Sequence, residues 1–234
     1  RGHVQQHDVL DVTLQHAGLD GRAQRHHLVG VHALVGFFAE ERGHFLDDLG
    51  HAAHAAHEHD LVDVGSFDPD PVDFPDIARA VCEVPVSGTD QGRWLDLCAG
   101  PGGKAALMGA LARIESAHVD AVEVSPHRAK LIEKTVQGLP VTVHVADGRD
   151  PQVGSGFDRI LVDAPCSGLG ALRRRPEARW RKSEADIAEL STLQFELLSS
   201  ALKLVRPGGV VVYSTCSPDL RETRTIVDQA VEKL

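Results

Sequence analysis

Short apolar runs alternate with stretches of helical character from about residue 78 onward. Each apolar run has the length of a short strand. The runs are residues 93–100, 119–124, 141–146, 157–164 and 209–215. Residues 104–114 between the first two runs favour a helix, and helix start signals follow the second and the fourth run. Strands that alternate with helices predict an α/β domain with a doubly wound, mostly parallel sheet.

Two helix starts can be located from capping chemistry. Ser125 is a good N-cap residue, and Pro126 suits the first helical position because its missing N–H would have no partner there. Ser183 and Asp186 have the spacing of a capping residue and its third-position partner, which predicts a long helix to about Leu204.

Residues 1–77 lack this regularity. They hold 11 of the 14 histidines and 14 acidic residues against four arginines, so the net charge of −10 belongs to this segment. Residues 8–19 have apolar positions near helical spacing and predict a short helix, whereas the proline-rich stretch 68–76 predicts a linker. We therefore expect an acidic, His-rich extension over 1–77, weakly structured or foreign to the rest, and a catalytic domain over 78–234.

A metal site in the extension is the alternative to this interpretation. His51, His54 and His57 lie three residues apart, near one face of a helix, and imidazole is a common metal ligand. A polar, weakly structured extension explains the same histidines without a ligand. The sequence prediction is therefore that no metal is bound.

Charge, hydrophobicity and cysteine spacing exclude some classes of function and leave others open. Residues 78–234 carry equal numbers of basic and acidic residues, so the overall acidity does not exclude RNA binding. No apolar run approaches the roughly 18 residues of a membrane span, so no membrane partner is expected. The four cysteines are widely spaced and include no CxxC pair, which favours reduced thiols and a cytoplasmic location.

A glycine-rich turn follows the first predicted strand, and three kinds of nucleotide site can be compared with it. A P-loop requires glycine where Cys98 stands and Ser or Thr where Ala105 stands, so it is excluded. A dinucleotide fingerprint is weakened by Ala105 but not excluded, because alanine is permitted there. An S-adenosylmethionine loop also needs glycines for close backbone approach. Its residues here would be Cys98, Ala99, Gly100, Pro101, Gly102, Gly103 and Lys104.

Acidic residues at two further strand ends favour S-adenosylmethionine. Glu123 ends the second strand and can accept hydrogen bonds from both ribose hydroxyls, while Asp147 follows the third strand and is placed to meet the adenine edge. The alternative is that both are ordinary polar residues at strand ends.

Two thiols occupy the ends of the last two predicted strands. Cys166 follows residues 157–164 and Cys216 follows residues 209–215, so a parallel sheet brings them together beside the cofactor cleft. Two cysteines facing a methyl donor suggest covalent catalysis. A thiolate that adds to carbon 6 of a pyrimidine makes carbon 5 nucleophilic, and the carboxyl group of Asp163 can stabilise the adduct at nitrogen 3.

Five motifs together give the sequence its resemblance to a known family. They are "DLCAGPGGK", "VEVSPHR", "ADGRD", "DAPCSGLGALRRRPEARWR" and "GGVVVYSTCS", which span about residues 93–217. These stretches resemble the Sun-type RNA cytosine-5 methyltransferases, especially bacterial enzymes acting on small-subunit (16S) ribosomal RNA. The resemblance implies that Cys216 is the nucleophile, that Cys166 assists product release, and that residues 98–104, Glu123, Asp147 and Asp163 contact S-adenosyl-L-methionine.

Two departures from the family pattern are visible. No likeness to the family's N-terminal RNA-binding domain is found in residues 1–77, and the chain ends at Leu234, before the last two strands expected of the family's sheet. The sequence thus predicts a catalytic domain that lacks these strands. Two alternative functions follow: a non-catalytic RNA-binding relative or inactive fragment, and, less well supported, a nicotinamide-dependent oxidoreductase.

A basic cluster follows the Cys166 loop directly. Its position beside the predicted cleft favours contact with RNA phosphates over a solvated loop, and Trp180 could stack on a base. The residues are Arg173, Arg174, Arg175, Arg179, Arg181 and Lys182. We expect the partner to be RNA, and ribosomal RNA in particular, and we expect the enzyme to be a monomer.

Overall fold

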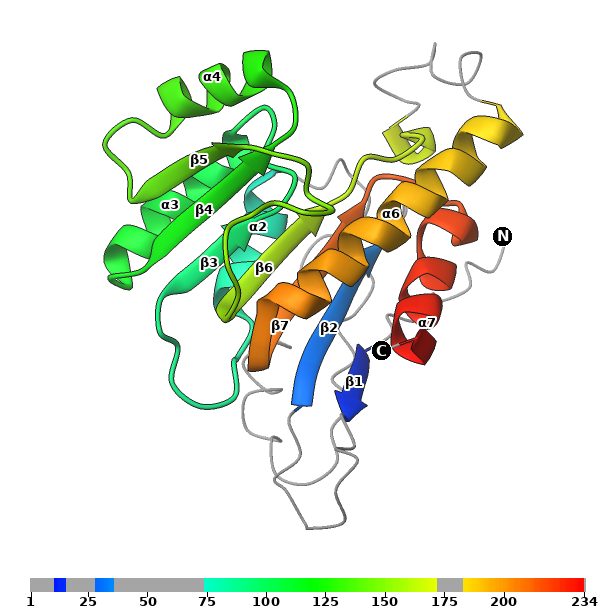
Figure 1. Cartoon of the computed structure of the whole chain (residues 1–234), viewed down its shortest axis with the longest axis horizontal. Helices are drawn as coiled ribbons and strands as arrows, with labels where there is room; N and C mark the ends of the chain where they lie inside the picture. The colour runs from blue at the N-terminus through cyan, green and yellow to red at the C-terminus, as the bar shows by residue number, and fades with distance from the viewer. Residues whose placement is uncertain (1–10, 16–27, 36–73, 172–182, 234) are drawn as a thin grey trace, which may run out of the picture.

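The computed structural model describes residues 11–15, 28–35, 74–171 and 183–233. These residues form one seven-stranded sheet flanked by helices (Figure 1). The strands are β1 (Asp11–Gln15), β2 (Leu28–Val35), β3 (Arg93–Asp96), β4 (His118–Glu123), β5 (Val141–Val145), β6 (Phe157–Asp163) and β7 (Val205–Thr215). The predicted α/β class with a doubly wound, mostly parallel sheet is confirmed.

The strand order is β1-β2-β7-β6-β3-β4-β5. Every neighbouring pair from β2 to β5 is parallel, and only β1 runs antiparallel to its neighbour β2. The chain moves outward from β3 through β4 to β5 and then returns to β6 on the other side of β3. This reversal creates a topological switch point at the carboxyl ends of β3 and β6, where open α/β sheets bind their ligands.

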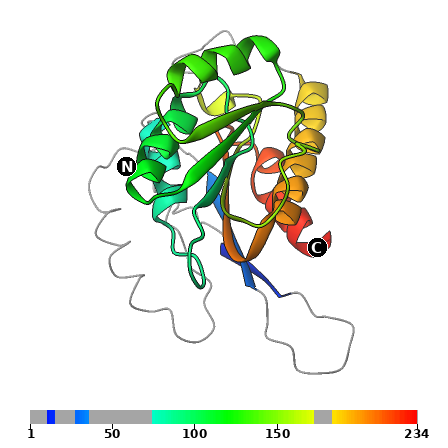
Figure 2. The same ribbon diagram turned by 60° about the vertical axis from the view of Figure 1, so that its left-hand side comes forward.

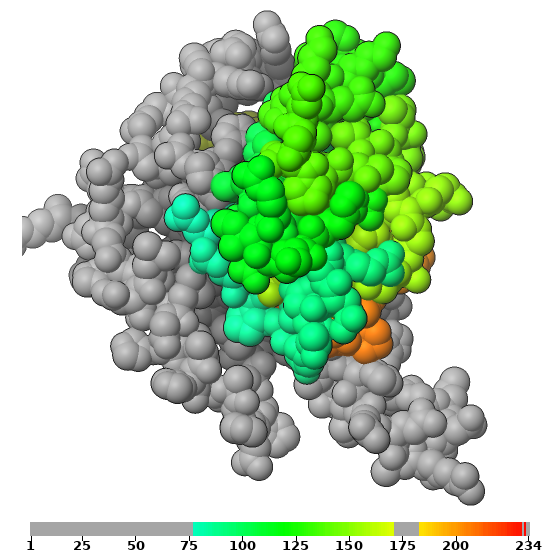
Figure 3. All heavy atoms as spheres, turned by 90° about the vertical axis from the view of Figure 1, so that its left-hand side faces the viewer, coloured from blue at the N-terminus to red at the C-terminus, as the bar shows by residue number. Residues whose placement is uncertain are grey.

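Helices cover both faces of the sheet, as Figures 1 and 2 show. One face carries α2 (Phe74–Glu83), α3 (Gly103–Ile114) and α4 (Pro126–Thr135), and the other carries α6 (Glu184–Leu204) and α7 (Arg224–Lys233). The β5 end of the sheet with α3 and α4 forms the surface seen in Figure 3. None of the helices in the described part of the chain combines the length and the hydrophobicity that a membrane crossing requires.

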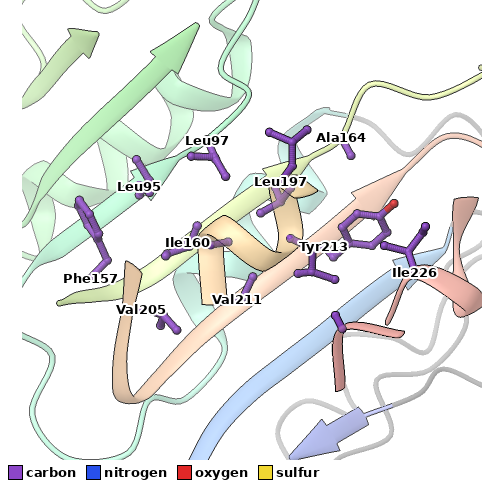
Figure 4. Packing of buried hydrophobic residues seen from close by; sticks show 14 of the residues in the cluster. Leu95, Leu97, Phe157, Ile160, Ala164, Leu197, Val205, Val211, Tyr213 and Ile226 are labelled. Carbon is purple, nitrogen blue, oxygen red and sulfur yellow. The ribbon is translucent and has the colours of Figure 1, made fainter. Parts of the chain in front are cut away.

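Alternation along the central strands explains the two hydrophobic cores. In β7, Val211 and Tyr213 pack toward α6 and α7, whereas Val210 and Val212 pack toward α2. Figure 4 shows the first of these cores, in which Ile160 of β6 and Leu197 of α6 are also buried. Strands covered on both faces are largely apolar, and this is why they were recognisable as apolar runs in the sequence.

The predicted helix starts are present. The Ser125 side chain accepts a hydrogen bond from the backbone N–H of Arg128, with Pro126 in the first turn of α4. Ser183 and Asp186 form a reciprocal capping box at the start of α6, and that helix ends at Leu204 as expected. Local side-chain chemistry therefore determined both starts.

Two predictions for residues 1–77 were wrong in detail. Within the helix predicted for 8–19, residues 11–15 form strand β1, because pairing with β2 supplies backbone hydrogen bonds that the helical spacing did not reveal. Helix α2 begins at Phe74, inside the predicted linker 68–76; Pro75 is compatible with a first helical turn. The domain boundary at residues 77 and 78, which α2 crosses, stays a prediction.

Arginine–carboxylate pairs close the amino ends of the central strands. Asp158 of β6 is fully buried and accepts a hydrogen bond from Arg206 Nε at 2.5 Å and another from the backbone N–H of Arg93 at 3.0 Å. Arg159 Nε lies 2.7 Å from Asp90 Oδ2, and its guanidinium also donates to the Val81 carbonyl of α2 at 3.0 Å. These pairs attach α2 and the loop before β3 to the sheet.

Candidate active site

The carboxyl ends of the parallel strands bring four acids to one edge of the sheet. Asp96 is the last residue of β3, Glu123 the last of β4 and Asp163 the last of β6, while Asp147 lies two residues beyond β5. Three of these acids were predicted site residues. Asp96 was not, although it directly precedes the glycine-rich turn.

The turn at 97–102 is held by backbone hydrogen bonds to the neighbouring strands. The Leu97 N–H donates to Leu161 of β6 and the Ala99 N–H to Val122 of β4, both at 2.9 Å. Gly102 has φ of 112°, a left-handed conformation that favours glycine, and it is the N-cap of α3. The turn therefore crosses the switch point and opens directly into a helix N-terminus.

The absence of a side chain at Gly100 lets the Glu123 carboxylate pack directly against the glycine turn. A Cβ atom at Gly100 would lie 2.0 Å from Glu123 Oε2. The other carboxylate oxygen, Oε1, accepts from the Ser125 N–H at 2.7 Å and pairs with Arg128 Nη2 at 2.8 Å. The carboxylate is thus fixed through Oε1, and Oε2 faces the glycine turn.

Asp96 is a buried carboxylate with an unused oxygen. Its Oδ1 accepts from the Cys98 N–H at 3.4 Å, and among the described residues Oδ2 has no hydrogen-bond partner. Burial raises the pKa of Asp96 to about 7, with Lys104 opposing the shift and Asp163 adding to it. A buried acceptor without a partner is costly and points to a ligand donor at this position.

Asp163 is tied to two side chains of the site. Lys104 Nζ lies 2.5 Å from Asp163 Oδ2, and the Ser214 hydroxyl donates to Oδ1 at 2.8 Å. Lys104 is buried at the start of α3, so the ion pair links the glycine turn to the end of β6. The sequence placed both residues in the site, and the fold brings them into contact.

Asp147 is held by Arg149. The Arg149 guanidinium donates to both carboxylate oxygens, with Nη2 2.6 Å from Oδ2, and the hydrogen bonds lower the pKa of Asp147. Any contact with an adenine edge would share these oxygens with Arg149. The adenine contact of Asp147 stays a prediction.

Cys166 and Cys216 meet at the same edge. Their sulfur atoms are 3.1 Å apart, both thiols are free, and Cys216 is the more exposed. The hydrogen bond from Cys216 lowers the pKa of Cys166 to about 7, and the same interaction raises the pKa of Cys216. The pair therefore loses one proton near neutral pH and keeps the other between the two sulfurs.

The other two cysteines have less reactive environments. Burial raises the pKa of the Cys98 thiol, and it raises that of Cys82 to about 12. A protonated thiol is a weak nucleophile. The lowered pKa thus distinguishes Cys166 from Cys82 and Cys98, and Cys216 differs from those two by its contact with Cys166.

Two sequence predictions concern residues for which the structure gives no contacts. The basic cluster (Arg173, Arg174, Arg175, Arg179, Arg181 and Lys182) lies outside the described residues, as do His51, His54 and His57. Within the described ranges, no group of three or more histidine, cysteine or acidic side chains is arranged to hold a metal ion. The turn η1 (Leu169–Ala171) ends directly before the basic cluster.

The residues at the switch point fit S-adenosyl-L-methionine. The unused Asp96 oxygen, the Glu123 oxygen facing a glycine, and the helix N-terminus at Gly102 offer acceptors and backbone N–H groups at one edge of the sheet. The ligand's amino and ribose hydroxyl groups supply matching donors. Glu123 and residues 98–104 would hold it.

Comparison with known proteins identifies the family. Residues 85–234 match the family model described as 16S rRNA methyltransferase RsmB/F. The chain belongs to this family. The resemblance drawn from the five motifs is confirmed, and so is S-adenosyl-L-methionine as the cofactor of this methyltransferase domain.

Individual relatives agree with this membership. The chain is 59% identical over 157 residues to MT1451 of Mycobacterium tuberculosis, covering 67% of this chain and 34% of that protein. It is 37% identical over 188 residues to ribosomal RNA small subunit methyltransferase B of Serratia proteamaculans, covering 78% and 42%. The crystal structure of PH0851 superimposes with a TM-score of 0.61 at 31% identity, over 69% of this chain and 36% of that one. The chain thus spans less than half the length of these relatives.

Residues 1–73 match a different family model, described as NAD-specific glutamate dehydrogenase. This match covers less than a third of the chain and does not overlap residues 85–234. It includes none of the acids, thiols or glycines of the site. The two models divide the chain close to the predicted boundary between the acidic segment and the catalytic domain.

Proposed function

We propose that the chain carries the catalytic core of an S-adenosylmethionine-dependent RNA cytosine-5 methyltransferase that acts on 16S ribosomal RNA. The observation that carries the proposal is the 3.1 Å approach of Cys166 and Cys216 beside the cofactor crevice. Methyl transfer to a nitrogen or oxygen atom requires no thiol. Methyl transfer to carbon 5 of a pyrimidine does, because that carbon becomes nucleophilic only after a nucleophile has added to carbon 6.

Cys216 is the proposed nucleophile and Cys166 its partner. Cys216 is the more exposed thiol, so it can reach a base that enters from solvent. The lowered pKa of Cys166 makes that sulfur the acceptor of the Cys216 proton as the carbon–sulfur bond forms. S-adenosyl-L-methionine, when bound, supplies the methyl group for carbon 5.

Release of the product requires a base as well. After methylation, carbon 5 must lose its proton so that the bond between carbon 6 and Cys216 can break. Cys166 receives this proton after its own has passed to solvent, and Cys216 leaves as a thiolate. The net reaction replaces the hydrogen on carbon 5 with a methyl group and releases one proton.

Asp163 is proposed to meet nitrogen 3 of the cytosine ring. Lys104 and Ser214 each engage one of its oxygens, which orients the carboxyl group and leaves a lone pair on each oxygen. At this position the carboxyl group can hold a proton from solvent against nitrogen 3, which stabilises the negative charge that develops on the ring as Cys216 adds, and the proton returns to solvent when the adduct breaks down. Its contact with Lys104 also places it at the edge of the cofactor crevice.

RNA contact is assigned to the basic cluster at 173–182. The sequence of the cluster begins two residues after η1, and the Gly170 N–H of η1 donates to the Cys216 carbonyl at 2.9 Å. The described chain thus contacts the Cys216 loop shortly before the cluster begins, which supports contact with phosphates that flank an unstacked cytosine. A cytoplasmic location is part of the proposal, since reduced thiols are required.

Covalent trapping with RNA that contains 5-fluorocytosine tests the function. Fluorine on carbon 5 cannot leave as a proton does, so the enzyme should stall as a covalent adduct with the RNA. The adduct should survive denaturation, and methylation of the trapped base should require the cofactor. RNA with ordinary cytosine is the control and should release. An absence of adduct together with normal cofactor binding would instead support a non-catalytic RNA-binding relative.

A further inference from the structure

A buried polar cluster lies beneath the two thiols. Ser167 directly follows Cys166, and Ser217 directly follows Cys216. Both serines are buried, as are Gln194 of α6 and Glu222 at the end of the turn η2 (Leu220–Glu222). None of these four residues has a part in the chemistry proposed above.

Glu222 receives hydrogen bonds from both cysteine loops. The Ser167 and Ser217 hydroxyls both donate to Oε2, and the Ser167 N–H donates to Oε1 at 2.8 Å. Gln194 Nε2 donates to Oε1 at 3.0 Å. The carboxylate is completely buried, and within the described residues its two oxygens accept these four hydrogen bonds.

Further contacts fix the position of Glu222 and of the two loops. The Tyr213 hydroxyl donates to the Glu222 carbonyl at 2.8 Å, and Gln194 Nε2 also donates to the Pro165 carbonyl at 2.8 Å. The two serine hydroxyls are 3.0 Å apart, so they converge on one point. Because each serine is one residue from its cysteine, the carboxylate determines how closely the two loops, and hence the two sulfurs, approach.

We propose that Glu222 is a positioning residue, which holds the loops after β6 and β7 in the register that brings Cys166 and Cys216 into contact. An amide at this position would need both serine hydroxyls as acceptors, which would leave one buried hydroxyl hydrogen without an acceptor inside the cluster, whereas the carboxylate accepts all four hydrogen bonds. The effect of Glu222 on methylation rests on the proposed function. Its effect on the distance between the two sulfurs does not depend on that function.

The thiol register can be measured without RNA. Diamide oxidises the two thiols to a disulfide, and its nitrogen–nitrogen double bond takes up the two electrons and the two protons. Mass spectrometry of the linked peptides follows this rate in the full chain. We expect Glu222→Gln to slow disulfide formation by at least about tenfold, because the effective concentration of one thiol at the other falls when the loops separate.

The same variant should lose methylation without losing the cofactor. Single-turnover methylation of RNA should fall by about 100-fold, the order expected for a misplacement of 1 Å, while the affinity for S-adenosyl-L-methionine stays within about twofold. Glu222→Asp, which keeps the charge, should recover part of both rates.

Asp158→Asn is the matched control, because Asp158 is also a fully buried carboxylate but lies at the amino end of β6. It should lower the melting temperature and leave the disulfide rate unchanged. If Glu222→Gln behaves like Asp158→Asn, Glu222 is merely structural and the proposal is overturned.

If Glu222→Gln does not fold, the double variant Ser167→Ala/Ser217→Ala replaces it in the test. The proposal expects the same slow disulfide formation in this variant, and an unchanged rate would overturn it. A wild-type chain that oxidises readily but forms no RNA adduct would refute the proposed function and leave the assignment of Glu222 in place.

Discussion

Asp158 and Asp163 stand near opposite ends of strand β6, and their surroundings differ in kind. Asp158 is fully buried, and Arg206 and the Arg93 N–H satisfy it completely as part of a structural tie. Asp163 is partly exposed and contacts Lys104 and Ser214, both of which line the site. The same residue type is thus fully paired and buried at one end of the strand and partly exposed, within the candidate site, at the other.

The difference extends along both edges of the sheet. At the amino edge, arginines close off Asp90 and Asp158. At the carboxyl edge, Asp96 has an unused buried oxygen, and two free thiols lie in contact. Buried polar groups without a hydrogen-bond partner are tolerated where a ligand supplies that partner. The carboxyl edge, which has such a group, is therefore the candidate functional edge, and the amino edge, whose acids are paired, is the structural one.

The largest effect is expected for Cys216→Ala. Loss of the nucleophile should lower turnover by at least about 10³-fold and abolish the adduct with 5-fluorocytosine RNA. Gel electrophoresis under denaturing conditions detects the adduct. Cys82→Ala, which alters a thiol outside the site, is the control and should trap RNA normally. A trapped adduct in Cys216→Ala would reassign the nucleophile to Cys166.

Cys166→Ala should lower turnover by about 10²- to 10⁴-fold, the range for loss of an acid–base group, and yet keep the adduct. The adduct should accumulate even on ordinary RNA, because removal of the carbon 5 proton is slow. In the wild type, adduct formation should rise through about pH 7 with ionisation of Cys166. In the variant, the rise should move toward the ordinary thiol value of about 8.5. An unchanged pH profile would contradict the role of Cys166 as proton acceptor.

At the amino edge, Asp158→Asn should act on stability alone. Removing one partner of a buried ion pair leaves Arg206 uncompensated and should lower the free energy of unfolding by about 3 kcal/mol. Urea denaturation measures this loss. Cofactor affinity below the unfolding transition should be unaffected. A matching loss of cofactor affinity would remove the distinction between the two edges.

Glu123→Ala should weaken S-adenosyl-L-methionine binding by roughly 1.5–3 kcal/mol, or about 10- to 100-fold, because hydrogen bonds to a charged acceptor are lost. Calorimetry measures the affinity. Arg128→Ala is the control: it removes the ion pair to Glu123 Oε1 but leaves the carboxylate in place, so its effect should be much smaller. Equal losses in the two variants would show that Glu123 acts only through Arg128.

Asp96 should make the stability of the fold depend on pH. Burial raises its pKa in the folded state from 3.8 to about 7, so between these values the folded chain binds more protons than the unfolded chain. The free energy of unfolding should therefore fall as the pH rises from about 4 to about 7, by at most about 1.4 kcal/mol for each pH unit. Asp96→Asn should lack this decrease. Parallel stability curves for variant and wild type would contradict an ionisable Asp96 in the folded state.

The sequence predicted the elements of residues 78–234 well because their signals are local. Apolar runs marked the five strands, and capping chemistry marked the starts of α4 and α6. The strand β1 was missed because a strand depends on a partner elsewhere in the chain, here β2. Asp96 was missed because the lack of a hydrogen-bond partner for its buried oxygen depends on the fold, which the residue type alone does not indicate.

The sequence by itself determined the family and the chemical groups at the strand ends. It did so because the glycine turn, the two thiols and the strand-end acids occur in short motifs, and parallel strands bring their carboxyl ends together in any doubly wound sheet. Only the tertiary structure decided how these groups meet. Three features join residues that lie about 50 or more positions apart in the sequence, with the short Ser217–Glu222 link as the exception. They are the contact of Lys104 with Asp163, the 3.1 Å approach of the two sulfurs and the convergence of both cysteine loops on Glu222. Such distances depend on strand register and side-chain packing, which no local pattern encodes.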